Sequence, residues 1–154
     1  SNVYGEGQPL YRIIPRAIAA AKMGRPIKLH GGGKSIRNFI HITDVNRALF
    51  EIIHRGQIGA TYHISGLESI SIATLVSMIF DDCGCSVDSG LVEVVQERAG
   101  KDHAYLLDSQ FLRASLDWND SVSLSDGIAR TITWFDTWWD SPSFLDSMVY
   151  QHKQ

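Results

Sequence analysis

Long apolar runs and an excess of positive charge are both missing from this sequence of 154 residues. A membrane-spanning helix needs about 20 apolar residues, and no run approaches that length. The first residues also lack the basic, apolar and small-residue order of a signal peptide, so we expect a cytoplasmic protein that does not enter a membrane. At a net charge of -3, the chain has no basic excess to hold a nucleic-acid backbone. These absences leave an ordinary globular protein, and its length suits a single domain over residues 1–154.

Cysteine is scarce, and the residues that bind metals lack a ligand spacing. The only two cysteines, Cys83 and Cys85, form C-x-C, which differs from the C-x-x-C of thioredoxin-like and zinc sites. We expect two reduced thiols in a turn after a helix. The six histidines show no H-E-x-x-H or other tight spacing, so the sequence predicts no metal site.

Several catalytic and cofactor motifs are also missing. No G-x-S-x-G provides a nucleophile, and no G-x-x-G-x-x-G turn follows an N-terminal strand, so we expect no dinucleotide cofactor bound by this chain alone. The stretch GGGKS at 31–35 suggests a phosphate loop, but Lys28 stands where that loop needs its first glycine. A strand rather than a helix is expected to follow it. A hairpin turn, in which glycines adopt positive φ, is favoured instead.

The residues that are present alternate between strand and helix patterns, which predicts an α/β fold with short strands and about five helices. The clearest unit covers 37–49, where Phe39, Ile40 and Ile42 form a strand and Thr43 or Asp44 caps a helix. The other predicted helices cover 10–23, 72–82 with Ser69 or Ser71 as cap, 108–116 and 125–139; the other predicted strands cover 27–30, 61–64 and 91–95. The bulky aromatic residues of 125–139 are expected to pack in a core or an interface.

Seven blocks in unbroken order resemble the C-terminal half of nucleotide-sugar 4,6-dehydratases of the dTDP-glucose type, which are extended short-chain dehydrogenase/reductases. The blocks are SNVYG at 1–5, RIIP at 12–15, GRPI at 24–27, RNFIHITDVNRAL at 37–49, GATYHISG at 59–66, RAGKD at 98–102, and Gly127, Ile128, Thr131 and Trp134. They match the family patterns SNNYGP, KLIP, GKPL, VRDWLYVEDHARAL, GETYNIGG, RPGHD and GIRKTVEWY. The resemblance implies a C-terminal domain that binds the nucleotide-sugar.

The resemblance also implies that cofactor binding and catalysis belong to a separate N-terminal Rossmann half. In that family the Rossmann half holds NAD and carries a Y-x-x-x-K pair, and the complete enzyme oxidises the sugar at C4, eliminates water and returns the hydride. Tyr4 cannot replace the tyrosine, because Gln8 stands where the lysine is needed. We therefore expect no catalytic residue in this chain, an inactive isolated domain, and the missing Rossmann half as its partner.

The substrate residues come from the same resemblance. Carried over, Asn2 and Arg12 contact sugar and diphosphate, Arg37 and Arg98 neutralise phosphate oxygens, and His30 lies beside the base. The chemistry of arginine supports these roles, because a planar guanidinium matches two phosphate oxygens at once and stays charged.

Four positions of the expected site depart from the family pattern. His30 replaces a tyrosine, Lys28 a proline, His63 an asparagine, and Lys101 a histidine. If these residues lie on the nucleotide side, the base need not be thymidine. The alternatives are the nucleotide-sugar epimerases and decarboxylases of the same family, a stand-alone module that binds a nucleotide-sugar, and an assembly module without catalysis.

Assembly is the last expectation. In the family, the segments that contain Phe39, Ile40, Tyr62 and Ile64 pack within the Rossmann half, so these residues are expected to lose their covering here. Uncovered apolar strand edges pair with other chains. We therefore expect a homodimer or higher homo-oligomer that buries this strand region.

Overall fold

The computed structural model describes residues 1–86, 90–97, 100 and 102–141, and over these residues the fold is mixed α/β, as predicted. The described helices are α1 (Ile13–Met23), α2 (Ile42–Arg55), α3 (Ile72–Asp82), α4 (Gln110–Leu116) and α5 (Leu124–Trp138). The described strands are β1 (Asn2–Tyr4), β2 (Ile27–His30), β3 (Ile36–His41), β4 (Ser69–Ser71), β5 (Val92–Val95) and β6 (Ala104–Tyr105). Across those ranges no helix combines the length and apolar character that crossing a membrane requires.

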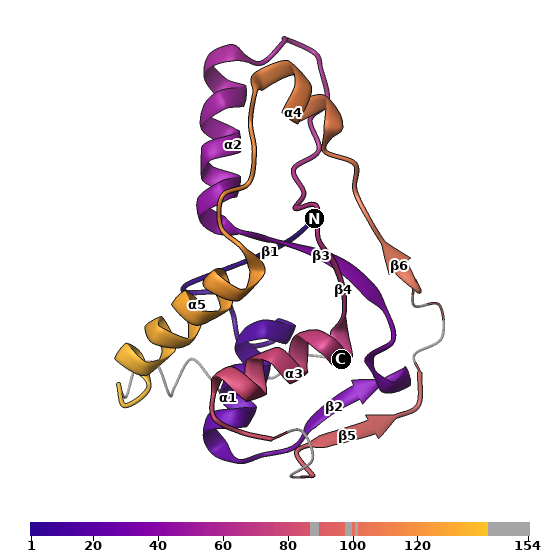
Figure 1. Ribbon diagram of the computed structural model, residues 1–154, viewed down its shortest axis with the longest axis vertical. Coiled ribbons are helices and arrows are strands. Elements are labelled where there is room, and N and C mark those ends of the chain that lie inside the picture. The colour runs from indigo at the N-terminus through magenta and orange to yellow at the C-terminus, as the bar shows by residue number, and fades with distance from the viewer. Residues whose placement is uncertain (87–89, 98–99, 101, 142–154) are drawn as a thin grey trace.

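Strand β3 organises the larger sheet. Its second half, Phe39 to His41, pairs in parallel with β1, while its first half pairs antiparallel with β4 and parallel with β6. A separate two-stranded parallel sheet joins β2 to β5. Figure 1 shows β1 and β3 crossing the middle of the molecule, between α2 and α4 at one end and α1, α3, β2 and β5 at the other.

Two apolar cores lie on either side of these crossing strands. The larger core joins α1, α3 and α5 to β2, and its fully buried side chains include Ile18, Leu75, Phe80 and Phe135. The smaller core joins β3, α2 and α4 and is built from Ile40, Ala48, Leu112, Leu116 and Trp118. Of the aromatic residues of α5, Phe135 packs in this core as expected, whereas Trp138 is 48% exposed.

The expectation that the β3 region is uncovered is wrong. Ile40 is only 3% exposed, because α4 returns over the strand and packs beside α2. Tyr62 stacks on Phe111 of α4 with ring centroids 5.0 Å apart, and Ile64 packs against the same core. The apolar surface that stays exposed here is instead the outer face of α2, formed by Leu49, Phe50 and Ile53.

Three predicted helix starts need correction. Helix α1 begins at Ile13 rather than at residue 10, because the preceding residues form a turn in which the Arg12 N–H donates to the Pro9 carbonyl. Helix α2 is capped by His41, whose Nδ1 accepts from the Thr43 N–H at 3.3 Å, and neither Thr43 nor Asp44 is the cap.

Helix α5 begins one residue earlier than predicted, at Leu124. Its cap is Ser123, whose Oγ accepts from the Asp126 N–H at 3.1 Å, so Ser125 and Asp126 lie inside the helix. The predicted cap Ser71 of α3 is confirmed, because its Oγ accepts from the Thr74 N–H at 3.0 Å.

Two strand predictions were wrong. Residues 61–64 are not a strand, because Tyr62 and Ile64 are anchored under α4 rather than paired with a neighbouring strand. The Gly31–Gly33 segment is a short 3-10 turn and not a hairpin, because β2 pairs with β5 instead of the following β3. Its three glycines do have the expected positive φ, between 59° and 68°.

Candidate functional site

The N-terminus of α1 has two arginines, Arg12 and Arg16, close to its first turn. Arg12 occupies its cap position without a capping side-chain hydrogen bond, and the first turn contains no acidic residue. Arg16 lies four residues on and therefore shares the helix face of Arg12. Since the first N–H groups of a helix also carry partial positive charge, this end of α1 favours a negatively charged ligand.

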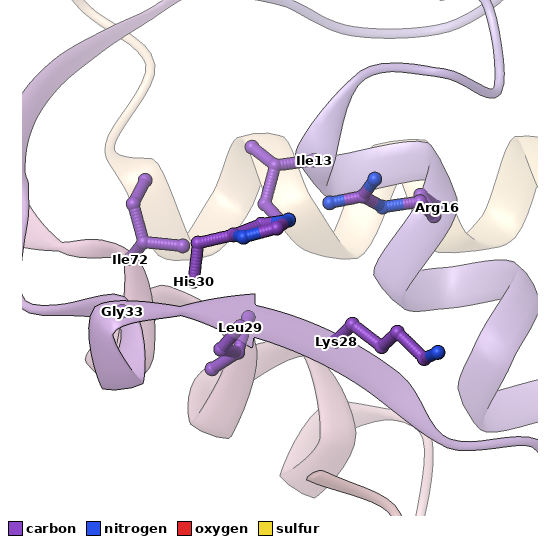
Figure 2. Close-up of a pocket in the computed structure, with 7 residues that line it drawn as sticks. All are labelled: Ile13, Arg16, Lys28, Leu29, His30, Gly33 and Ile72. Atoms are coloured by element: carbon purple, nitrogen blue, oxygen red, sulfur yellow. The ribbon is translucent and has the colours of Figure 1, made fainter. Parts of the chain in front are cut away.

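Two adjoining cavities open beside this helix end. The larger, of about 500 Å³, is lined by β1, the start of α1 and Phe39 of β3. The smaller, of about 160 Å³, is lined by Lys28, Leu29 and His30 of β2 together with Ile72 of α3 (Figure 2). Ile13 and Arg16 line both cavities, so the two adjoin at these side chains, and together they are called the cleft. None of the residues that the structure gives as lining the cleft is acidic.

The larger cavity contains two of the predicted substrate residues, Asn2 and Arg12. The side-chain amide of Asn2 is positioned by a 3.0 Å hydrogen bond from its Nδ2 to the Asn38 carbonyl of the neighbouring β3. The guanidinium of Arg12 lies over the ring of Tyr11, 5.3 Å from its centroid. The larger cavity therefore places the side-chain amide of Asn2 and the guanidinium of Arg12 beside the positive end of α1.

The smaller cavity contains two more predicted residues, Lys28 and His30. The Nδ1 of His30 lies 3.0 Å from the Gln96 carbonyl, and because a carbonyl only accepts, Nδ1 carries the proton. Lys28 extends over solvent, with its Nζ 3.9 Å from Glu93 Oε2. Exposed pairs of this kind contribute little to stability, and Lys28 also lines the smaller cavity.

The other predicted substrate residues lie elsewhere. The guanidinium of Arg37 donates to the backbone carbonyls of Ile36 at 2.7 Å, Asp102 at 2.9 Å and His103 at 3.4 Å, and thus holds the segment before β6 against β3. His63 is exposed in the segment that runs under α4 and lines neither cavity.

Two predictions, Arg98 and Lys101, lie outside the described residues. Sequence reasoning missed Arg16, although its spacing of four residues from Arg12 was a readable signal for a shared helix face.

The buried carboxylate of Asp44 has a structural role outside the cleft. It is fully buried, and its oxygens accept hydrogen bonds from the Ser121 N–H and Oγ, the Val122 N–H and the Arg47 guanidinium, at 2.9 to 3.0 Å. Burial alone would raise the pKa of Asp44, but the hydrogen bonds from Val122 and Ser121 and the charge of Arg47 lower it overall. Asp44 therefore ties α2 to the segment that leads into α5. Over the described residues, no cluster of three or more His, Cys, Asp or Glu side chains could hold a metal ion.

Two further groups, one buried and one partly buried, have raised pKa values. Burial, followed by the charge of Asp44, raises the pKa of the Tyr4 hydroxyl, which donates to the Leu124 carbonyl at 3.3 Å. A Cβ at Gly127 would overlap this hydroxyl, so the close approach of α5 to β1 requires glycine there. Burial also raises the pKa of the Cys83 thiol to about 11. Both cysteines are free thiols, as expected.

The fold and the cleft together define an α/β domain whose cleft has basic and no acidic side chains among its described lining residues. Comparison with known proteins places the chain more narrowly: it belongs to the GDP-mannose 4,6-dehydratase family, whose model matches residues 1–131. The resemblance to nucleotide-sugar dehydratases of the short-chain dehydrogenase/reductase type is therefore confirmed.

Individual relatives agree with this placement. The chain is 34% identical over 143 residues to the dTDP-glucose 4,6-dehydratase of Streptomyces griseus, covering 91% of this chain and 43% of that protein. It superimposes with a TM-score of 0.83 and 30% identity on the dTDP-glucose 4,6-dehydratase of Streptomyces venezuelae, whose structure contains NAD, over 90% of this chain and 44% of that one.

An epimerase of the same fold is also similar. The UDP-glucuronic acid 4-epimerase of Bacillus cereus, in complex with NAD and a UDP-sugar analogue, matches with a TM-score of 0.80 and 25% identity, over 88% of this chain and 43% of that one. The chain thus spans less than half the length of each of these relatives.

Proposed function

We propose that this chain is the nucleotide-sugar-binding part of an NAD-dependent nucleotide-sugar 4,6-dehydratase. The cleft grips the nucleoside diphosphate of the sugar, and the hydride chemistry takes place on a Rossmann half that acts as the partner of this domain. Relatives of both the dTDP and the UDP type contain NAD in their solved structures, which supports the assignment of a nicotinamide-dependent enzyme.

The single observation that carries this proposal is a cleft lined by Arg12, Arg16, Lys28 and His30 without an acidic residue among its described lining. A diphosphate supplies the matching negative charge and the paired oxygens that a guanidinium recognises. The amide of Asn2 and the end of α1 supply neutral donors at the same place. One charge-assisted contact of this kind contributes about 1.5 to 3 kcal/mol.

The residues that the structure describes do not fit NAD. A dinucleotide needs a glycine-rich turn between a strand and a helix, so that the helix end faces the pyrophosphate. The glycine turn at Gly31–Gly33 leads from β2 into β3, which is a strand. We therefore derive no catalytic step for this chain and assign it substrate binding alone.

The second candidate is the corresponding part of a nucleotide-sugar 4-epimerase. The likeness to the Bacillus cereus epimerase favours it, since that structure holds a UDP-sugar analogue in the same fold. The 4,6-dehydratase and the 4-epimerase both require that this cleft bind the nucleoside diphosphate.

Calorimetric titration of the 154-residue chain with UDP, dTDP and NAD tests the proposal. We expect saturable binding of UDP or dTDP and no saturable heat with NAD at millimolar concentration. Arg12→Gln should weaken nucleotide binding by about tenfold or more, whereas Arg25→Gln, an exposed arginine just after α1 that lines neither cavity, should change nothing. Absence of binding by both nucleotides would refute the proposed function, and saturable NAD binding would refute the division of roles.

A further inference from the structure

Arg16 is the one charged side chain that lines both cavities of the cleft over the described residues. It rises from α1 one turn beyond Arg12, and side chains four residues apart on a helix are neighbours. Figure 2 shows its guanidinium pointing toward the ring of His30, across the smaller cavity from Ile72. Any ligand that extends from one cavity into the other must therefore pass Arg16.

The sizes of the two cavities indicate the direction in which a nucleoside diphosphate lies. The smaller cavity, about 160 Å³, has a planar imidazole and two apolar side chains, Leu29 and Ile72, which suit a flat base. The larger, about 500 Å³, holds Asn2 and Arg12 and has room for the terminal phosphate and the sugar. The phosphate that is joined to the nucleoside then falls at the junction of the cavities.

We propose that Arg16 binds this first phosphate of the nucleoside diphosphate and so fixes the register of the ligand across the cleft. The inference rests on the proposed function and extends it to a residue outside the seven blocks that resemble the dehydratases. Arg12 and Arg16 place two positive charges near the positive end of α1. A phosphate at the junction meets both charges, and the planar guanidinium of Arg16 can bind two of its oxygens.

A ligand series separates the contribution of each phosphate. Uridine, UMP and UDP, or the corresponding thymidine compounds if these bind better, are titrated into the chain and followed by NMR, which measures affinities into the millimolar range. We expect Arg16→Gln to weaken UMP and UDP by about tenfold or more and to leave the nucleoside within about twofold. Arg12→Gln should weaken UDP more than UMP, because Arg12 lies at the terminal phosphate.

Two further variants keep the test independent of folding. Arg16→Lys retains the positive charge but loses the planar guanidinium that binds two oxygens. Its affinity for UMP should therefore fall between those of the wild type and Arg16→Gln. Arg25→Gln, the matched change at the other end of α1, should behave as the wild type in all three titrations.

Three outcomes would overturn the inference. Unchanged UMP and UDP affinity in Arg16→Gln, with a wild type that binds UDP, would remove Arg16 from the site and leave the proposed function standing. An equal loss for uridine, UMP and UDP would place Arg16 at the base rather than at a phosphate. A wild type that binds none of the nucleotides would refute both the inference and the proposed function.

Discussion

Replacing Asp44 with asparagine tests how this fold is held together. In the wild type, one carboxylate oxygen accepts from the N–H and Oγ of Ser121 and from Arg47, and the other accepts from the Val122 N–H. An asparagine that keeps the first three acceptor contacts must turn its NH2 group toward the Val122 N–H. That buried donor is then left without an acceptor.

The expected cost follows from these contacts. A hydrogen bond to a charged group contributes about 1.5 to 3 kcal/mol and a neutral one about 0.5 to 1.5 kcal/mol. The bond from Val122 is lost and the two bonds from Ser121 become neutral, while Arg47 keeps its own charge, so Asp44→Asn should lower the free energy of unfolding by about 3 to 6 kcal/mol. This is a large share of the 5 to 15 kcal/mol or so typical of a domain.

Urea unfolding followed by tryptophan fluorescence measures this loss, and its pH dependence identifies the cause. The pKa of Asp44 is lowered from its ordinary value of 3.8. Its carboxylate therefore stabilises the fold fully above that value, and the contribution is lost as the pH falls through the lower folded-state pKa. The difference between wild type and Asp44→Asn should accordingly be complete at pH 7 and should shrink in acid.

The matched control is Asp81→Asn, an exposed aspartate in the last turn of α3. Carboxylates are unfavourable near the negative end of a helix, so this change should leave stability unchanged or raise it slightly. A loss below about 1 kcal/mol in Asp44→Asn, or a loss that is the same at pH 7 and pH 3, would show that the Asp44 carboxylate does not stabilise the fold in this way.

Three further predictions follow from the buried groups and the exposed surface. Gly127→Ala should destabilise the fold by about 1 to 3 kcal/mol, because its Cβ overlaps the Tyr4 hydroxyl, although alanine inside a helix normally stabilises it. A higher melting temperature would contradict the close approach of α5 to Tyr4. The pKa of Cys83 is raised from 9.0 to about 11, so its thiolate fraction at pH 8 should be about 100-fold below that of an ordinary cysteine. A Cys85→Ser variant, in which Cys83 is the remaining cysteine, should therefore react slowly with a thiol reagent. A rate equal to that of free cysteine would exclude the effect of burial on this pKa. The expected homo-oligomer should now form through the outer face of α2; light scattering at micromolar concentration that gives the mass of one chain would rule it out.

The strand and helix elements with a clear periodic pattern could be predicted from the sequence. The unit over β3 and α2, the strand β2 and the helix α3 with its cap Ser71 were all expected, because each is long enough to show alternation or a helical repeat. Strands β4 and β6 have three and two residues, which is too short to carry a pattern. These two strands form because their backbones pair with β3.

The site could be predicted in part, because the family resemblance identifies positions but not contacts. Asn2, Arg12, Lys28 and His30 do line one cleft. Two of the three backbone carbonyls that accept hydrogen bonds from Arg37 belong to Asp102 and His103, more than 60 residues away, and no local pattern encodes that pairing. His63 was expected near the nucleotide on a strand that does not form.

The most direct test of the nucleotide cleft is an NMR titration of the assigned 154-residue chain with UDP and dTDP. We expect saturable chemical-shift changes that concentrate at the backbone amides of Asn2, of the first turn of α1 and of β2 from Lys28 to His30. Shift changes confined to the surfaces of α4 and α5, or no saturable change with either nucleotide, would contradict nucleotide binding at this cleft.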